Sequence, residues 1–137
     1  MSNVVIVAEN GLGRYQQGIR IGEHSLIADE PVNVGGADAG PAPFDFVMAG
    51  LGACTSMTLR MYAERKSLPL TGISVALSHA KIDVDGQSRD QISREITLEG
   101  NLTDEQRQRL LEIAGKCPVH RALSQSMTIE SRLAESA

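Results

Sequence analysis

Two cysteines, Cys54 and Cys117, are the residues of this chain best suited to covalent chemistry. A thiolate attacks peroxides and binds metals, whereas a free cysteine with an ordinary pKa of about 8.5 is mostly protonated at neutral pH. A reactive cysteine therefore needs a cation, a hydrogen-bond donor or a helix N-terminus beside it. Because cysteine is also among the most buried residue types, an inert place in the core is the alternative for each of the two.

Cys117 stands directly before Pro118, and this order predicts a short helix with Pro118 in its first turn and Cys117 as its cap. The sulfur would then face backbone N–H groups that lack a partner in the helix and favour a thiolate. His120 follows three residues later, so Cys-Pro-Val-His could also form half of a zinc site. Zinc normally takes three or four protein ligands, and the other cysteine and histidines are distant in the sequence. We therefore expect no metal.

The composition excludes several other classes of function. With 137 residues, 42% of them hydrophobic, the chain fits one globular domain over residues 1–137. The net charge of -4, without a cluster of Lys or Arg, argues against binding to nucleic acid or to an anionic membrane. The first residues lack the basic start and long apolar run of a secretory signal, so we expect a cytoplasmic protein. Structural disulfides are uncommon in that compartment, which leaves the cysteines inert, redox-active or metal-binding.

The elements that must position Cys54 begin with a run of short strands. Alternating segments at residues 3–9, 14–22 and 24–30 predict an antiparallel meander, with glycine-containing turns between them. The segment from Pro31 to Pro43 is dense in Gly and Pro and predicts a loop. Loops of this kind often line functional sites.

A helix carrying Cys54 follows this loop. The segment from Pro43 to Ala63 is apolar on nearly every face, which is typical of a helix buried in a core. Asp45 in its first turn favours the positive end of the helix dipole. Gly50 and Gly52 each cost such a helix about 1 kcal/mol relative to Ala, which indicates that another part of the chain approaches the backbone there.

The second half of the chain predicts a hairpin, a helix and a closing strand. Residues 71–84 and 92–100 alternate as strands around a polar turn, and Arg94 falls on the apolar side of the second. Such an arginine is more often ion-paired or snorkelling than catalytic. A capping box at Thr103 begins a helix whose apolar face ends at Cys117, and the alternating residues 127–133 predict the last strand. The order βββ-α-ββ-α-β belongs to the α+β class.

Three segments, residues 28–66, 92–123 and 127–131, together resemble the OsmC/Ohr family of organic hydroperoxide reductases and OsmC-like redox proteins. The resemblance covers nearly the whole chain. It implies the α+β fold of that family and an intertwined homodimer, in which the long central helices are buried and the active sites lie near the subunit interface.

The same resemblance implies a cofactor-free thiol peroxidase acting on organic hydroperoxides. Cys54 would be the peroxidatic residue and Cys117 the resolving residue, and an external dithiol, such as a lipoyl protein, would reduce the resulting disulfide. A weaker reading of the resemblance is a stress-response or binding protein with a redox-sensitive cysteine pair and little turnover.

Family peroxidases also use an arginine from the N-terminal hairpins, held by an acid on the central helix, to stabilise the thiolate. By position this arginine would be Arg14, with Arg20 as the second choice. The family's glutamate stands ten positions before the cysteine, where this chain has Phe44, and the nearest acid is Asp45. Asp45 is therefore the candidate for the acid.

Overall fold

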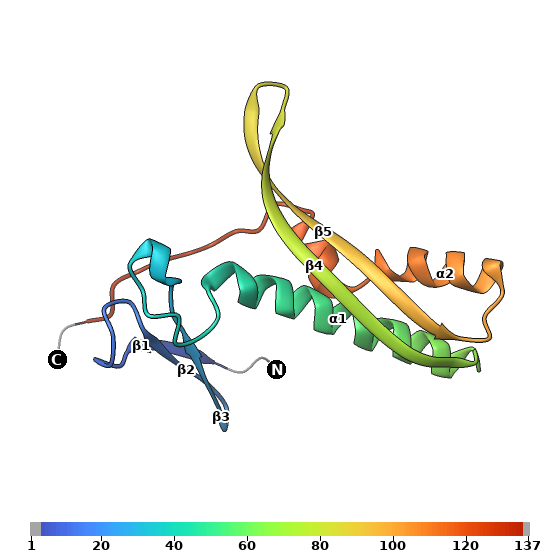
Figure 1. Ribbon diagram of the computed structural model, residues 1–137, viewed down its shortest axis with the longest axis horizontal. Coiled ribbons are helices and arrows are strands. Elements are labelled where there is room, and N and C mark those ends of the chain that lie inside the picture. Colours follow the sequence, from blue (N-terminus) through green and yellow to red (C-terminus); the bar gives the residue numbers. More distant parts are fainter. Residues whose placement is uncertain (1–3, 136–137) are drawn as a thin grey trace. The chain divides into compact units, whose positions relative to one another are not determined.

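The computed structural model describes residues 4–135 (Figure 1). These residues form two compact units. The first unit contains the residues up to Ala49 together with His79–Gln91, and the second contains Gly50–Ser78 and the residues from Ile92 onward. The expectation of one domain over residues 1–137 remains a prediction.

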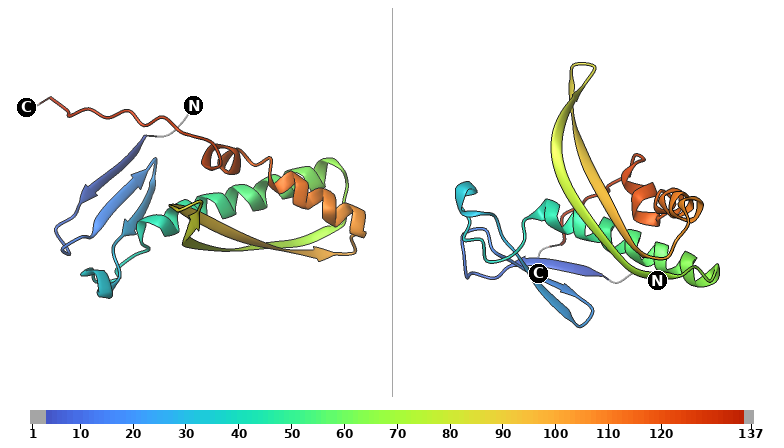
Figure 2. Two further views of the ribbon diagram at one scale, coloured as in Figure 1. Left: turned by 90° about the horizontal axis from the view of Figure 1, so that it is seen from above. Right: turned by 45° about the vertical axis from the view of Figure 1, so that its right-hand side comes forward.

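The sheet of the first unit is the predicted meander. Strands β1 (Val5–Glu9), β2 (Gln17–Ile21) and β3 (His24–Ala28) pair antiparallel in the order β1-β2-β3, and Figure 2 shows them side by side. Gly22, with φ of +58°, allows the tight turn between β2 and β3. The sequence therefore placed all three strands correctly, although residue 3, where the first was predicted to begin, lies outside the described residues.

A buried carboxylate holds the predicted Gly/Pro loop in one conformation. Asp29 is only 3% exposed, and its carboxylate accepts hydrogen bonds from the backbone N–H groups of Glu30, Ala37 and Ala39 over 2.8 to 3.1 Å. These bonds, that of Ala39 above all, outweigh burial and lower the pKa of Asp29. A Cβ at Gly36 would overlap the carbonyl oxygen of Glu30, so the loop depends on glycine there. The same loop contains the 3₁₀ turn η1 (Val32–Val34).

Helix α1 (Pro43–Arg65) begins at the predicted proline, but it is buried on one side only. Its buried residues recur about every four positions through the second unit, which marks a single stripe: Leu51, Gly52, Thr55, Leu59, Tyr62 and Ala63. Met57 and Met61, on the other side, are 59% and 65% exposed. The prediction that every face is buried was thus wrong for the single chain, because the elements of one chain that pack on α1 cover one face.

Strands β4 (Leu70–Val84) and β5 (Gln87–Gly100) form a long two-stranded hairpin. The predicted polar turn is shorter than expected. Only Asp85 and Gly86 connect the strands, and both have positive φ, as a two-residue type I′ turn requires. Strand β5 therefore begins at Gln87 rather than Ile92, because this Asp-Gly pair turns the chain by itself.

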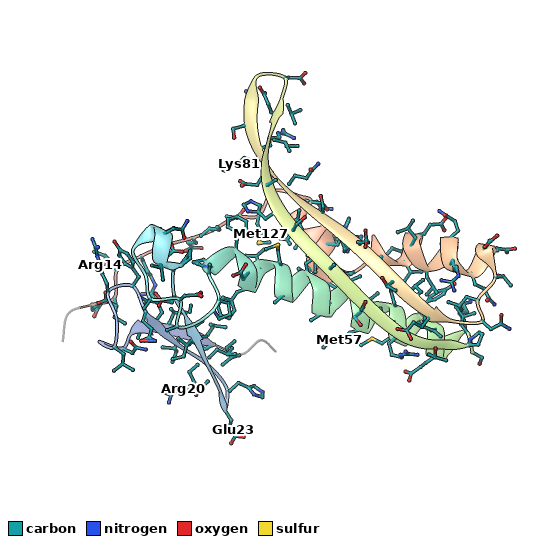
Figure 3. The ribbon with its side chains drawn as sticks, in the orientation of Figure 1. Arg14, Arg20, Glu23, Met57, Lys81 and Met127 are labelled. Carbon is teal, nitrogen blue, oxygen red and sulfur yellow. The ribbon has the colours of Figure 1, made fainter. Side chains whose placement is uncertain are left out.

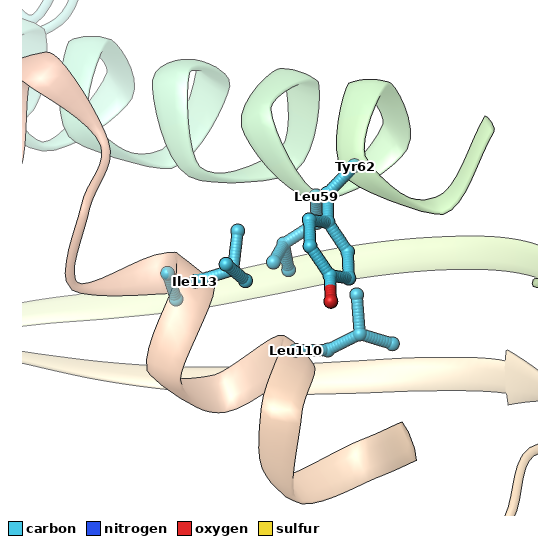
Figure 4. Packing of buried hydrophobic residues seen from close by; sticks show 5 residues of the cluster. Leu59, Tyr62, Leu110 and Ile113 are labelled. Atoms are coloured by element: carbon cyan, nitrogen blue, oxygen red, sulfur yellow. The ribbon is translucent and has the colours of Figure 1, made fainter. Parts of the chain in front are cut away.

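The core of the second unit lies between α1 and α2 (Asp104–Ala114), against the hairpin strands (Figure 4). It is formed by Leu59 and Tyr62 from α1 and by Leu110, Ile113 and Ala114 from α2. Each fully buried large aliphatic side chain contributes about 1.5–3 kcal/mol to folding. The start of α2 is the predicted capping box, in which Thr103 and Gln106 exchange side-chain to backbone hydrogen bonds.

After α2 the chain turns into α3 (Pro118–Leu123) and then runs without regular structure to residue 135. The predicted closing strand at residues 127–133 was therefore wrong for the single chain. Ile129 and Leu133 are 85% and 95% exposed, and an alternating pattern forms a strand only where a neighbouring strand completes its hydrogen bonds. Within residues 4–135, no helix has the length and apolar character needed to cross a membrane.

Candidate active site

The fold brings the two cysteines into contact within the second unit. Cys54 lies on α1 and Cys117 lies between α2 and α3, both are free thiols, and each side chain is close enough to shift the pKa of the other. Cys54 is partly exposed, whereas Cys117 is completely buried. Neighbouring cysteine side chains are the arrangement from which a disulfide can form.

The surroundings favour the thiolate form of Cys54. Burial raises the pKa of this thiol, but hydrogen bonds from the Cys117 thiol, the Val119 backbone N–H and the Thr58 hydroxyl lower it by more, together with the positive charge of Arg94. Each of these groups stabilises negative charge on sulfur. The result is a cysteine whose pKa lies below its ordinary value, which is the property that a nucleophilic thiol needs.

Cys117 is the protonated partner of this pair. Burial and the neighbouring Cys54 sulfur raise its pKa, although it caps α3 and accepts a hydrogen bond of 3.3 Å from the His120 backbone N–H. The sequence correctly predicted the cap. That this cap favours a Cys117 thiolate remains a prediction, and the Val119 N–H in the first turn of α3 lowers the pKa of Cys54, the residue that the family resemblance implies as peroxidatic.

Arg94, for which the sequence favours an ion-paired or snorkelling role, lies beside this pair. From β5 its guanidinium donates to Oγ1 of Thr55 over 2.9 Å and to the carbonyl oxygen of Ala114 over 3.4 Å. It also lies 3.0 Å from Nδ1 of His120. The apolar alternation of β5 indicated which way Arg94 points, but nothing in the sequence indicated what it would meet.

Arg14 and Asp45 lie in the first unit. The Arg14 guanidinium stacks 4.9 Å above the ring of Tyr15, and Asp45 accepts a hydrogen bond of 2.9 Å from the Ala42 backbone N–H at the start of α1. Figure 3 shows Arg14 by the turn after β1 and Arg20, the second choice, on the sheet. The catalytic roles of these residues remain predictions.

Phe44, which occupies the place of the family's glutamate, is part of an aromatic pair. Its ring stacks on that of His79 at 4.0 Å and an interplanar angle of 6°. His79 in turn contacts the Asp90 carboxylate over 2.8 Å, and Lys81 lies 3.1 Å from the same carboxylate. At the position where the family resemblance would place a glutamate, this chain therefore has an aromatic ring that packs within the first unit.

The comparisons with known proteins decide the family. The family model described as OsmC-like protein matches residues 35–132, which include both cysteines and Arg94. The chain belongs to the OsmC-like protein family. No curated protein sequence matches this OsmC-like protein significantly.

Solved structures show the same fold at low sequence identity. The OsmC-like protein is similar to an OsmC like protein from Mycoplasma pneumoniae with a TM-score of 0.76 and 16% identity, covering 90% of this chain and 88% of that one. For an organic hydroperoxide resistance protein OsmC from Legionella pneumophila, the TM-score is 0.70 and the identity 16%, with 90% of this chain and 89% of that one covered. For an organic hydroperoxide resistance protein from Elizabethkingia anophelis, the TM-score is 0.68 and the identity 18%, with 89% of this chain and 87% of that one covered. The predicted α+β fold is thereby confirmed as a mixed fold of helices and strands that matches OsmC/Ohr structures.

Proposed function

We propose that this OsmC-like protein is a thiol peroxidase that reduces organic hydroperoxides. The observation that carries the proposal is the proximity of the two cysteines, of which Cys54 is partly exposed and has a lowered pKa, whereas Cys117 is buried and has a raised pKa. A peroxidatic cysteine must be ionised to attack, and a resolving cysteine must be close enough to form a disulfide. The names of the two hydroperoxide resistance proteins of like fold support the same substrate class.

The reaction proceeds in two steps on the protein. The Cys54 thiolate attacks the terminal oxygen of the hydroperoxide, so that an S–O bond forms, the O–O bond breaks and the alkoxide leaves to take up a proton. Cys54 becomes a sulfenic acid and the peroxide is reduced to an alcohol. The Cys117 sulfur then attacks the Cys54 sulfur, hydroxide leaves and takes the thiol proton as water, and the disulfide closes.

An external dithiol completes the cycle. It reduces the Cys54–Cys117 disulfide by thiol–disulfide exchange and is itself oxidised to a disulfide. A protein-bound lipoyl group belongs to this chemical class. Because exchange begins with attack on an accessible sulfur, we propose Cys54 as the sulfur attacked, since it is partly exposed and Cys117 is not.

We also propose that the active form is a homodimer. The apolar side of α1 that carries Met57 and Met61 is exposed in one chain, and so are Ile129 and Leu133 in the segment after α3 (Figure 3 labels Met57 and Met127). Exposed apolar surface on this scale is typical of an interaction surface. A second copy would cover it and supply the neighbouring strand that the last segment lacks.

The direct test mixes the reduced protein with one equivalent of cumene hydroperoxide. Both thiols should disappear within seconds, and peptide mass spectrometry should find Cys54 linked to Cys117. In Cys117→Ser, only one thiol should be lost and Cys54 should carry one added oxygen, whereas Cys54→Ser should not react. Thiols that react no faster than free cysteine would contradict the proposal and favour a binding or stress-response protein with little turnover.

A further inference from the structure

The guanidinium of Arg94 is connected to both cysteines through its hydrogen-bond partners. Thr55 follows Cys54 on α1, and its hydroxyl accepts from Arg94 over 2.9 Å while donating to the Leu51 carbonyl oxygen over 2.6 Å. The Ala114 carbonyl oxygen accepts from Arg94 over 3.4 Å and also from the Cys117 backbone N–H over 3.5 Å. Movement of Arg94 would therefore disturb the backbone at each sulfur.

His120 completes the set of partners and shows where the positive charge lies. Its backbone N–H donates to the Cys117 sulfur, while its ring Nδ1 faces Nη2 of Arg94 at 3.0 Å. Because a guanidinium can only donate, Nδ1 must carry a lone pair and the ring is neutral. Burial and the charge of Arg94 both lower the pKa of His120, which keeps the ring in this form. The charge at this place therefore belongs to Arg94.

Other arginines of the second unit have their partners elsewhere. The Arg60 guanidinium donates to the Leu70 carbonyl oxygen, and that of Arg107 donates to the carbonyl oxygens of Leu98 and Gly100. Arg109 pairs with Glu112. Arg94 differs from them because each of its three partners is linked to a cysteine. Thr55 follows Cys54 in the chain, whereas Ala114 and His120 each share a hydrogen bond with Cys117.

We propose that Arg94 supplies the positive charge for the thiol pair, and that Thr55 and His120 are positioning residues that hold its guanidinium there. This goes beyond the expectation that an arginine of the N-terminal hairpins, Arg14 or Arg20, stabilises the thiolate. It rests on the proposed role of Cys54 as the ionised thiol. The titratable and charged groups that face Cys54 within the second unit are then Cys117 and Arg94, with His120 acting through Arg94.

The test measures the ionisation of Cys54 without any peroxide. In a Cys117→Ser background, where the serine hydroxyl can still donate to Cys54, the alkylation rate by iodoacetamide is followed against pH. Arg94→Met removes the charge and keeps most of the apolar stem, so the rate at neutral pH should fall several-fold, because a nearby opposite charge favours the thiolate. Arg94→Lys should restore most of the rate, because it restores the charge.

Arg107→Met is the matched control, since it removes another part-buried guanidinium of the second unit whose partners are the carbonyl oxygens of Leu98 and Gly100. It should leave the pH profile of Cys54 unchanged. An Arg94→Met protein with the pH profile of its parent and of the Arg107→Met control would overturn the proposal.

Two variants of His120 decide the question if Arg94→Met does not fold. Asn at this position can offer Oδ1 close to the place of Nδ1, so His120→Asn should keep the alkylation profile, whereas His120→Leu removes the acceptor and should slow alkylation at neutral pH. Equal profiles for the two variants would contradict the positioning role. These experiments measure alkylation of Cys54 and not peroxide turnover. Failure of the peroxidase proposal would therefore appear in the reaction with cumene hydroperoxide, and failure of this proposal would appear in the alkylation profiles.

Discussion

Gly52 on α1 and Leu77 on β4 approach so closely that a Cβ at position 52 would lie 2.8 Å from Cδ1 of Leu77. Gly52 is buried and stands two residues before Cys54, so this contact fixes the distance between the cysteine helix and the hairpin. Gly50, the other glycine that the sequence singled out, has open space around the same position.

This difference predicts unequal effects of alanine at the two glycines. Gly50→Ala should stabilise the protein by up to about 1 kcal/mol, because alanine is the better helix former. Gly52→Ala should stabilise it less, because the terminal methyl group of Leu77 must first move away from the new Cβ. Urea unfolding of the two variants measures both effects. Equal stabilisation by both alanines would show that the Leu77 side chain moves away at no cost.

Cys117 has a structural role besides its proposed chemistry, since its sulfur caps α3. Serine is a favoured cap and alanine is not, so Cys117→Ala should be less stable than Cys117→Ser by about 1 kcal/mol. Both variants lose the resolving thiol, and both should therefore lose turnover supported by a dithiol. Thermal unfolding separates the two effects. Variants of equal stability would mean that the hydrogen bond to His120 contributes nothing.

The pH dependence of the two thiols should differ in a definite order. The pKa of Cys54 is lowered and that of Cys117 is raised, so the alkylation rate of Cys54 should reach half its maximum at a lower pH than that of Cys117. Reaction of Cys54 with hydroperoxide should likewise persist as the pH falls below the ordinary cysteine pKa and be lost as it passes the lowered value. Peptide mass spectrometry after alkylation at a series of pH values assigns each midpoint. The reverse order would contradict the assignment of the thiolate.

Asp29 predicts a pH-dependent stability of the loop before α1. Its pKa is lower in the folded state, so its contribution is present above the unfolded pKa of about 3.9 and is lost as the pH falls through the folded value. Asp29→Asn should lower the denaturation midpoint at neutral pH and approach the parent in acid. Asp38→Asn is the control, because Asp38 is exposed and its φ of +54° suits asparagine. Similar midpoints for both variants at neutral pH would rule out a special role for Asp29.

The homodimer is tested by mass in solution. Light scattering of the parent should give twice the mass of one chain, and Met61→Glu should lower that mass or weaken the association, because it places a charge in an apolar interface. Met61 is 65% exposed in the single chain, so the substitution should not disturb the core of the monomer itself. A parent protein that is a monomer at micromolar concentration would exclude this assembly.

Local features of the fold could be predicted from the sequence. Pro43, the capping box at Thr103 and the Cys117–Pro118 start of α3 each act through the backbone of their own segment, and all three lie where they were expected. The turn at Asp85 was only partly anticipated. The sequence marked it as polar, but the two positive φ values that make it a two-residue turn depend on how β4 and β5 pair.

The proximity of Arg94 to the two cysteines could not be predicted from local patterns. Arg94 is far from Cys54 along the chain, and the alternation of β5 specifies a face of the strand but not the helices that pack on it. The helix start at Cys117 was expected to ionise its own sulfur. The Val119 N–H at the same helix start instead lowers the pKa of the other cysteine, an effect that depends on how the residues of α1 and α3 come together.

The hydrogen bond from the His120 amide to the Cys117 sulfur couples a peptide proton to the electronic state of a reacting atom. In the proposed cycle that sulfur passes from thiol to disulfide, so the acceptor changes while the peptide group stays in place. The amide resonance of His120 should therefore shift with each turnover and return on reduction. A single backbone nucleus would thus follow the redox cycle by NMR in the unmodified protein, with no dye, label or substituted side chain.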